Sequence, residues 1–207
     1  IADVQVRATV AYEDRKRDAD DHNNYLRTST GDQYWGIGGR NFQHRHQERE
    51  SLLLGVGVSG NLSPNWFYDV YMSEFTILSD EEVRTDLNPN DPSYLAQNEN
   101  FRGRLTEHGD TGWHTLDVKL GTESLLGSDD MRLSLGYHQD RYRLEIEPFN
   151  INSITGELGS ARDASGGDAG TRALFAQWGW GFDEAWDLAL GLRYEDWKSS
   201  EGYLGDE

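Results

Sequence analysis

The chain has 207 residues, a length that suits one all-β domain, and its 37 acidic against 19 basic residues give a net charge of −18. This acidity argues against nucleic acid as a partner, because nucleic-acid binding depends on a basic surface. The lack of cysteine excludes disulfides and thiolate sites, and no apolar run approaches the roughly 20 residues of a membrane-spanning helix.

Seven segments alternate apolar residues with polar or small ones, and no strong amphipathic helix is evident. Successive side chains of a strand point to opposite faces, so this period of two predicts strands with one apolar face each. In chain order the predicted strands cover residues 4–13, 52–59, 66–73, 115–121, 131–138, 172–182 and 186–197. The sequence starts with Ile1 rather than Met and opens inside a strand pattern, from which we expect an internal fragment of a longer protein.

The connections between these strands alternate in length. Three are short and three are long and polar: the short turns cover about residues 61–65, 124–130 and 183–185, and the long loops about 14–45, 78–110 and 143–170. Ordinary soluble domains rarely carry three structureless loops of about 30 residues. Outer-membrane barrels have short turns on the periplasmic side and long loops outside, so this rhythm favours a membrane barrel.

Aromatic residues gather near the strand ends, as in the two interfacial girdles of a membrane barrel. Those near short turns are Trp66, Phe182 and Trp186, and those near long loops are Tyr12, Tyr137 and Tyr194.

Charged residues within the strands fall on the face opposite the apolar one, at Arg7, Asp69, Asp117, Lys119, Arg132 and Arg193. A charge on the lipid face at mid-bilayer costs about 2–4 kcal/mol, so a membrane barrel explains their placement. A soluble β-sandwich or lipocalin-like barrel would show the same alternation, with these charges in water. Loop lengths and aromatic girdles are what separate the two, and they favour the membrane barrel.

Two stretches form the last predicted hairpin: "TRALFAQ" at 171–177 and "WDLALGLRYE" at 186–195. They resemble a recurring hairpin in the barrel of TonB-dependent outer-membrane receptors. "GDTGWHTLDVKLG" at 109–121 and "LSLGYHQDRYRL" at 133–144 are similar to the preceding strands of that family. The resemblance implies an all-β fold, an antiparallel meander of about seven amphipathic transmembrane strands within a larger outer-membrane barrel of about 22 strands. Residues 1–207 would then be a partial receptor barrel.

The function that the resemblance implies is active uptake of a scarce nutrient, such as a ferric siderophore, across the outer membrane of a Gram-negative cell. The expected partners are outer-membrane lipid, the small-molecule nutrient, and the TonB complex, which acts through a plug that no part of this sequence resembles. No catalytic set stands out, and neither enzyme activity nor a cofactor is expected. The alternatives are a soluble or surface β-sandwich or barrel that binds a ligand such as a carbohydrate, and an outer-membrane enzyme.

Aromatic and basic residues of the long loops are candidates for ligand contacts. Arginine suits anionic ligands, and aromatic rings stack on flat or sugar-like ones. The candidates are Tyr34, Trp35, Arg40, Phe42 and Tyr94. Loop packing without any ligand is the competing interpretation of the same residues.

Three motifs carry residues that can bind metal ions, but none of them predicts a metal site. His44 and His46 form an H-x-H pair, but they lack a third ligand and their arginine neighbours would repel a cation. "DLNPND" at 86–91 resembles the start of a calcium loop without its glycine and later glutamate, so an Asx-rich turn is expected. "DADDHNN" at 18–24 is an acidic cluster with the same weakness.

Overall fold

The computed structural model describes residues 4–19, 25–34, 45–85, 103–152 and 155–205. Within them, nine antiparallel strands form one sheet. They are β1 (Val4–Ala19), β2 (Arg45–Ser63), β3 (Trp66–Thr85), β4 (Gly103–Glu107), β5 (Gly112–Thr122), β6 (Met131–Ile151), β7 (Leu158–Ala161), β8 (Ser165–Asp183) and β9 (Trp186–Leu204). In this part of the chain, no helix is long and apolar enough to cross a membrane.

All seven predicted strands are present, as β1, β2, β3, β5, β6, β8 and β9. The sequence did not predict β4 and β7. Strands β4 and β5 follow each other along the same line of the sheet, because each pairs with β3 on one side and β6 on the other. Residues 108–111 separate β4 from β5. The strands also run far into the ranges expected as loops, since β1 ends at Ala19, β3 at Thr85 and β6 at Ile151. The outer end of β1 is polar on both faces, so hydropathy alternation does not reveal it, whereas in β6 the alternation continues through Leu144 and Ile146.

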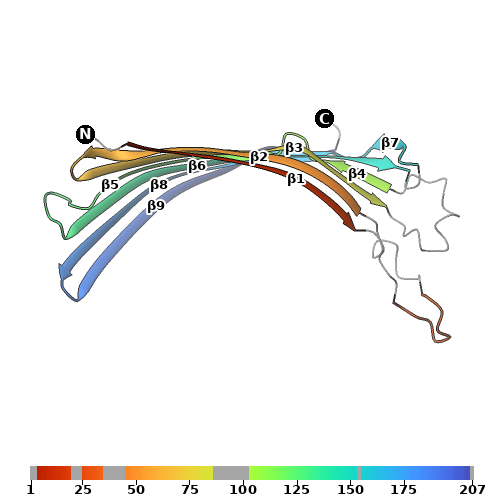
Figure 1. Cartoon of the computed structure of the whole chain (residues 1–207), viewed down its shortest axis with the longest axis horizontal. Coiled ribbons are helices and arrows are strands. Elements are labelled where there is room, and N and C mark those ends of the chain that lie inside the picture. The colour runs from red at the N-terminus through yellow and green to blue at the C-terminus, as the bar shows by residue number, and fades with distance from the viewer. Residues whose placement is uncertain (1–3, 20–24, 35–44, 86–102, 153–154, 206–207) are drawn as a thin grey trace.

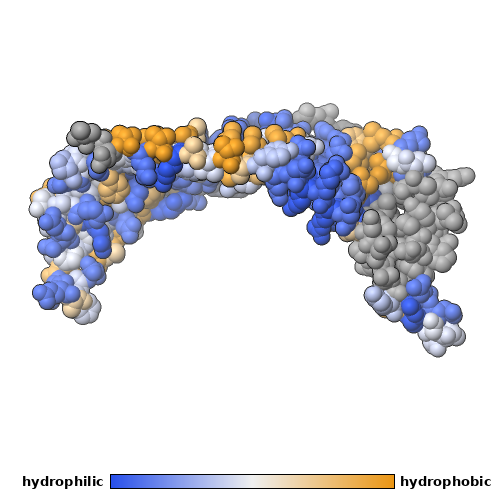
Figure 2. Space-filling model, viewed as in Figure 1, coloured by the Kyte–Doolittle hydropathy of each residue, from blue (hydrophilic) through white to orange (hydrophobic). Residues whose placement is uncertain are grey.

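The sheet is a curved arch, with the short turns β2–β3, β5–β6 and β8–β9 at one end and β4 and β7 at the other (Figure 1). We call these the turn end and the outer end. Apolar residues line the convex side of the arch, whereas hydrophilic residues dominate below it (Figure 2). The two sides are called the convex face and the concave face.

An uncovered apolar belt crosses the convex face. Directly opposite pairs carry it from strand to strand: Val10 and Leu54, Val56 and Met72, Leu120 and Leu135, and Trp178 and Leu190. Toward the outer end the belt stops at polar residues on the same face, namely Asp14, Glu50, Glu74, His114, Arg172 and Asp196. Apart from glycine and proline, only Ile77, Ile151 and Ala173 are buried among the apolar residues described, so this belt is not covered by another layer of the fold. Such a large apolar surface requires an apolar environment.

Large side chains on the concave face lie over glycines directly opposite them. Tyr71 covers Gly57 and reaches Gly55, Phe67 lies over Gly121, and Phe175 lies over Gly136. A Cβ atom at Gly136 would overlap with the ring of Phe175. The missing side chains therefore leave room for rings to lie flat on the sheet, which supports the ladder by cross-strand packing.

Ion pairs join the outer ends of β1 and β2 on the convex side. Lys16 donates a hydrogen bond to Glu48 (2.7 Å), and His46 is hydrogen-bonded to Asp18 and lies 3.3 Å from Glu48. The hydrogen bond with Asp18, more than any other contact, raises the pKa of His46. These residues lie beyond the apolar belt.

Replacing Leu190 with arginine should lower the free energy of unfolding by about 2–4 kcal/mol, because Leu190 lies in the middle of the apolar belt of β9 and is 55 % exposed. Gly191→Arg places the same charge one residue on, facing the concave side, and should cost about 0.5 kcal/mol or less. Chemical unfolding of the protein in lipid vesicles measures both. Equal losses for the two variants would contradict a lipid-facing belt.

Gly136→Ala should destabilise the sheet by about 1–3 kcal/mol, because its methyl group overlaps with the Phe175 ring and displaces it. Gly191→Ala is the matched control, since a Cβ there meets nothing closer than the Ala176 carbonyl oxygen at 4.0 Å. Unfolding midpoints of both variants test this, and an unchanged midpoint for Gly136→Ala would show that the ring is not fixed on the glycine.

Local stability at the outer end of β1 and β2 should fall as the pH rises above about 6.5, the ordinary pKa of histidine. The folded-state pKa of His46 lies above its ordinary value of about 6.5, so the contribution of the protonated imidazole is complete below that pH and is lost as the pH rises through the folded-state pKa. Amide hydrogen exchange in β1 and β2, corrected for intrinsic rates, measures it. His46→Gln should remove the pH dependence, and an unchanged dependence would assign it to another group.

Candidate functional site

The concave face is a polar wall at the level of the apolar belt. Arg7 donates to both carboxylate oxygens of Asp69 (2.7 and 2.8 Å). His138 bridges Asp117 and Asp140, at 2.7 Å to each, and Thr115 donates to Asp140 (2.9 Å). The strand register places all six charged residues expected opposite the apolar face on this side: Arg7, Asp69, Asp117, Lys119, Arg132 and Arg193. A wall of paired charges is compatible with a wet interior and not with lipid.

Three aromatic rings form a platform on the concave face toward the outer end. Trp113 lies directly opposite both Phe75 on β3 and Tyr142 on β6. Its ring stacks on Phe75 at 4.0 Å between centroids and lies 6.4 Å from Tyr142. Trp113 is 40 % and Tyr142 47 % exposed, so the platform offers apolar ring surface to a ligand. The guanidinium of Arg49 lies 5.8 Å from the Phe75 ring centre, within cation–π range.

Two carboxylates are buried farther toward the outer end, where β2, β3 and β4 meet. Asp80 is 6 % and Glu82 7 % exposed. Gln47 donates to Asp80 (2.8 Å), while His108 and Arg49 lie 3.5 and 3.9 Å from it. Buried carboxylates need such partners, because an unpaired buried charge is strongly unfavourable.

Glu82 is held by two arginines. Arg45 lies 3.3 Å from its carboxylate, and Arg84 forms a short ion pair with it. Burial, followed by repulsion from Arg45 and Arg104, lowers the pKa of Arg84.

The loop residues expected to contact a ligand lie mostly outside the described residues. Tyr34 is described: it is 44 % exposed, and its backbone amide donates to the Leu26 carbonyl oxygen (3.1 Å). Trp35, Arg40, Phe42 and Tyr94 fall outside the described ranges, so their role as ligand contacts stays a prediction.

Only part of the three motifs that resemble metal sites lies within the described residues. His46 is engaged with Asp18 and Glu48, whereas His44, residues 86–91 and most of 18–24 lie outside the described ranges. Among the residues that are described, no group of three or more His, Cys, Asp or Glu side chains is arranged to hold a metal ion.

Sequence reasoning missed the aromatic platform and the charged network around Asp80 and Glu82. A signal for the platform was present, because Trp113 precedes the apolar residues of its strand at odd spacing and therefore faces the concave side. The charged network carried no such signal. The register of β2 against β3 shifts between Glu50 and Ser51, which moves the face on which Asp80 and Glu82 lie.

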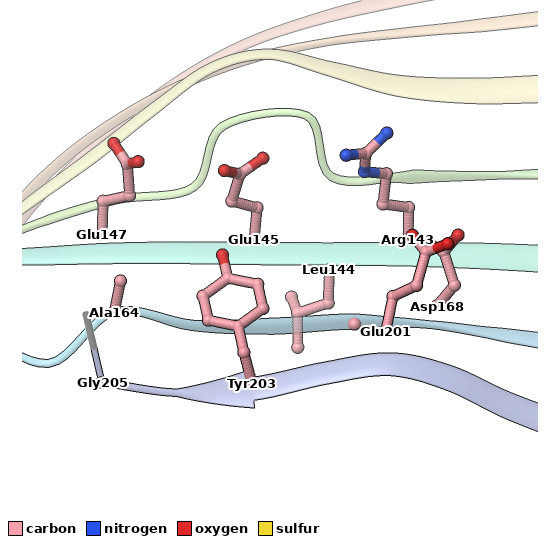
Figure 3. A pocket seen from close by; sticks show the side chains of 10 residues that line it. Arg143, Leu144, Glu145, Glu147, Ala164, Asp168, Glu201, Tyr203 and Gly205 are labelled. Carbon is pink, nitrogen blue, oxygen red and sulfur yellow. The ribbon is translucent and has the colours of Figure 1, made fainter. Parts of the chain in front are cut away.

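A cleft of about 420 Å³ lies on the opposite, convex side of the outer end. Figure 3 shows Arg143, Glu145 and Glu147 of β6 pointing into it beside Tyr203 of β9. Its lining is mainly acidic, and Asp168 there is paired with Arg141 at 2.7 Å. The cleft is separated by the sheet from the aromatic platform, so it does not form one site with it.

Comparison with known proteins agrees with this two-faced sheet. The family described as TonB dependent receptor-like, beta-barrel matches residues 2–206. No curated protein and no solved structure matches the chain. The match spans nearly the whole chain and favours an outer-membrane receptor barrel over a soluble β-sandwich, in agreement with the apolar convex and polar concave faces. The chain belongs to the β-barrel family of TonB-dependent receptors.

Proposed function

We propose that this chain is a section of barrel wall in a receptor that takes up a scarce nutrient, such as a ferric siderophore, into a Gram-negative cell. The observation that carries the proposal is the combination of an uncovered apolar belt on one face with paired charges on the other. That combination suits a sheet with lipid on its convex side and a wet lumen on its concave side.

The two edges of the sheet support a larger barrel. In the described residues β1 pairs only with β2, and β9 pairs only with β8. Each outer edge therefore offers a row of unpaired amides and carbonyls, which lipid does not tolerate. Further strands on both sides would satisfy these edges and close the barrel.

The orientation of the strands follows from the lengths of their connections. The turn end would face the periplasm, and the outer end, with residues 14–45, 78–110 and 143–170, would face the cell exterior. The aromatic platform would then lie on the lumen wall below the entrance. A ligand bound by the loops, through residues such as Tyr34, Trp35, Arg40, Phe42 and Tyr94, would meet it on the way inward. Release into the periplasm would depend on the TonB complex acting through a plug.

The uptake function predicts that cells expressing the full-length receptor accumulate a ferric siderophore only when TonB is present. The measurement is uptake of radiolabelled iron, supplied as a panel of ferric siderophores, in matched strains with and without TonB. Accumulation that is independent of TonB, or none for any member of the panel, would overturn the proposed function.

Trp113→Ala should weaken binding of the transported ligand by about three- to tenfold, because it removes the exposed central ring of the platform. Trp186→Ala is the control: it removes an equally large ring from the convex side beside the turn between β8 and β9, and should leave affinity unchanged. Equal affinities for Trp113→Ala and the unmodified receptor would show that the ligand bypasses the platform.

A further inference from the structure

Arginines face one another across several strands at the outer end of the concave face. Arg45 on β2 lies directly opposite Arg84 on β3, which lies directly opposite Arg104 on β4. Arg15 on β1 lies directly opposite Arg49 on β2. Directly opposite residues of an antiparallel sheet share a face, so these side chains lie on the concave face in two nearby rows. With Arg17, they form what we call the arginine cluster: Arg15, Arg17, Arg45, Arg49, Arg84 and Arg104.

Among the described residues, the arginine cluster has fewer carboxylates around it than guanidinium groups. Asp80 and Glu82 are the described acidic residues within its rows, and Glu13 follows one step toward the belt. In this part of the chain, six guanidinium groups therefore share the concave face with three carboxylates, although the whole chain carries a net charge of −18. A concave surface of one sign attracts ions of the opposite sign.

Like charges placed directly opposite each other destabilise a sheet. Within the described residues, the Nε atoms of Arg49 and Arg104 are buried without a hydrogen-bond partner, and Arg49 Nε lies 3.9 Å from the Asp80 carboxylate. Within the described residues, no carboxylate is paired with Arg104, whereas Glu82 is shared by Arg45 and Arg84. Repulsion together with free donors is the condition that a bound anion would relieve.

We propose that the arginine cluster binds a multiply charged anion, through its carboxylate or phosphate groups, and that this is the class of ligand the receptor takes up. The inference rests on the proposed uptake function and narrows it. Guanidinium groups match these anions because their planar donors can form two parallel hydrogen bonds with one carboxylate or phosphate. The cluster lies at the outer end, so an anion entering from that side meets it before the aromatic platform.

The test uses the full-length receptor in detergent and calorimetric titration with three probes: citrate, tripolyphosphate and the neutral sugar raffinose. Citrate and tripolyphosphate separate carboxylate from phosphate recognition. We expect at least one anion to bind, with an affinity that falls as sodium chloride is raised, and raffinose not to bind. Failure of both anions to bind the unmodified receptor, or equal binding of raffinose, would overturn the proposal.

Arg104→Gln and Arg84→Gln should each weaken binding of the anion by about tenfold, because each removes charge-assisted hydrogen bonds. Arg172→Gln is the matched control: it makes the same change in net charge on the convex face and should leave binding unchanged. Equal weakening by all three variants would show a general charge effect and overturn the site.

Thermal unfolding without anion separates a binding role from a structural one. If the cluster binds anions, Arg104→Gln relieves repulsion and should leave the melting temperature unchanged or raise it, while abolishing the increase that the anion produces. A lower melting temperature, with the anion-induced increase intact, would make Arg104 a structural residue.

TonB-dependent uptake of neutral ligands alone would overturn the anion proposal and leave the uptake function standing. Anion binding that depends on Arg104, without any TonB-dependent uptake, would overturn the uptake function and leave the anion site standing.

Discussion

The continuous backbone ladder is the interaction on which the rest of this structure depends. In lipid, every amide and carbonyl needs a partner within the protein, and the described strands provide one across each internal seam of the sheet. The buried apolar core of a soluble domain is absent here: apart from glycine and proline, only three apolar residues among those described are buried. The free energy that holds the sheet comes instead from the ladder, from rings lying on glycines such as Phe175 on Gly136, and from transfer of the convex belt out of water.

The same ladder determines which residues lie on each face of the sheet. Because side chains alternate, a single register assigns every residue to lipid or to lumen, and a slip by one residue would put Arg7 and Asp69 into the bilayer. The paired charges of the concave face therefore fix the register as firmly as the apolar belt does. At the outer end, the register shift between Glu50 and Ser51 lets the sheet bring Asp80 and Glu82 to the concave side, where the arginines lie.

The sequence was informative where a strand has lipid on one side and water on the other. All seven alternating segments are strands, and the turn between Asp183 and Trp186 falls where the short connection was predicted. The family was also accessible, because the hairpin around Trp186 carries a recognisable pattern of residues. The short strands of the outer end were not, since β4 has five residues and β7 four, too few to show a clear period of two. The arginine cluster could not be seen either: its members come from four separate strands, and only the strand register shows that Arg45, Arg84 and Arg104 stand in one row.

The extension of β1, β2 and β3 beyond the apolar belt has a consequence for how such a receptor can change. The arginines lie on hydrogen-bonded strands and not on the connecting segments. Their spacing is therefore set by the distance between neighbouring strands and by the rise per residue along each strand. Insertions, deletions or grafts in the connections after Ala19 and Thr85 would leave that spacing intact. If the arginine cluster binds an anion as proposed, its charge would be fixed by the sheet while the connections vary, so a new specificity could be acquired without refolding the barrel.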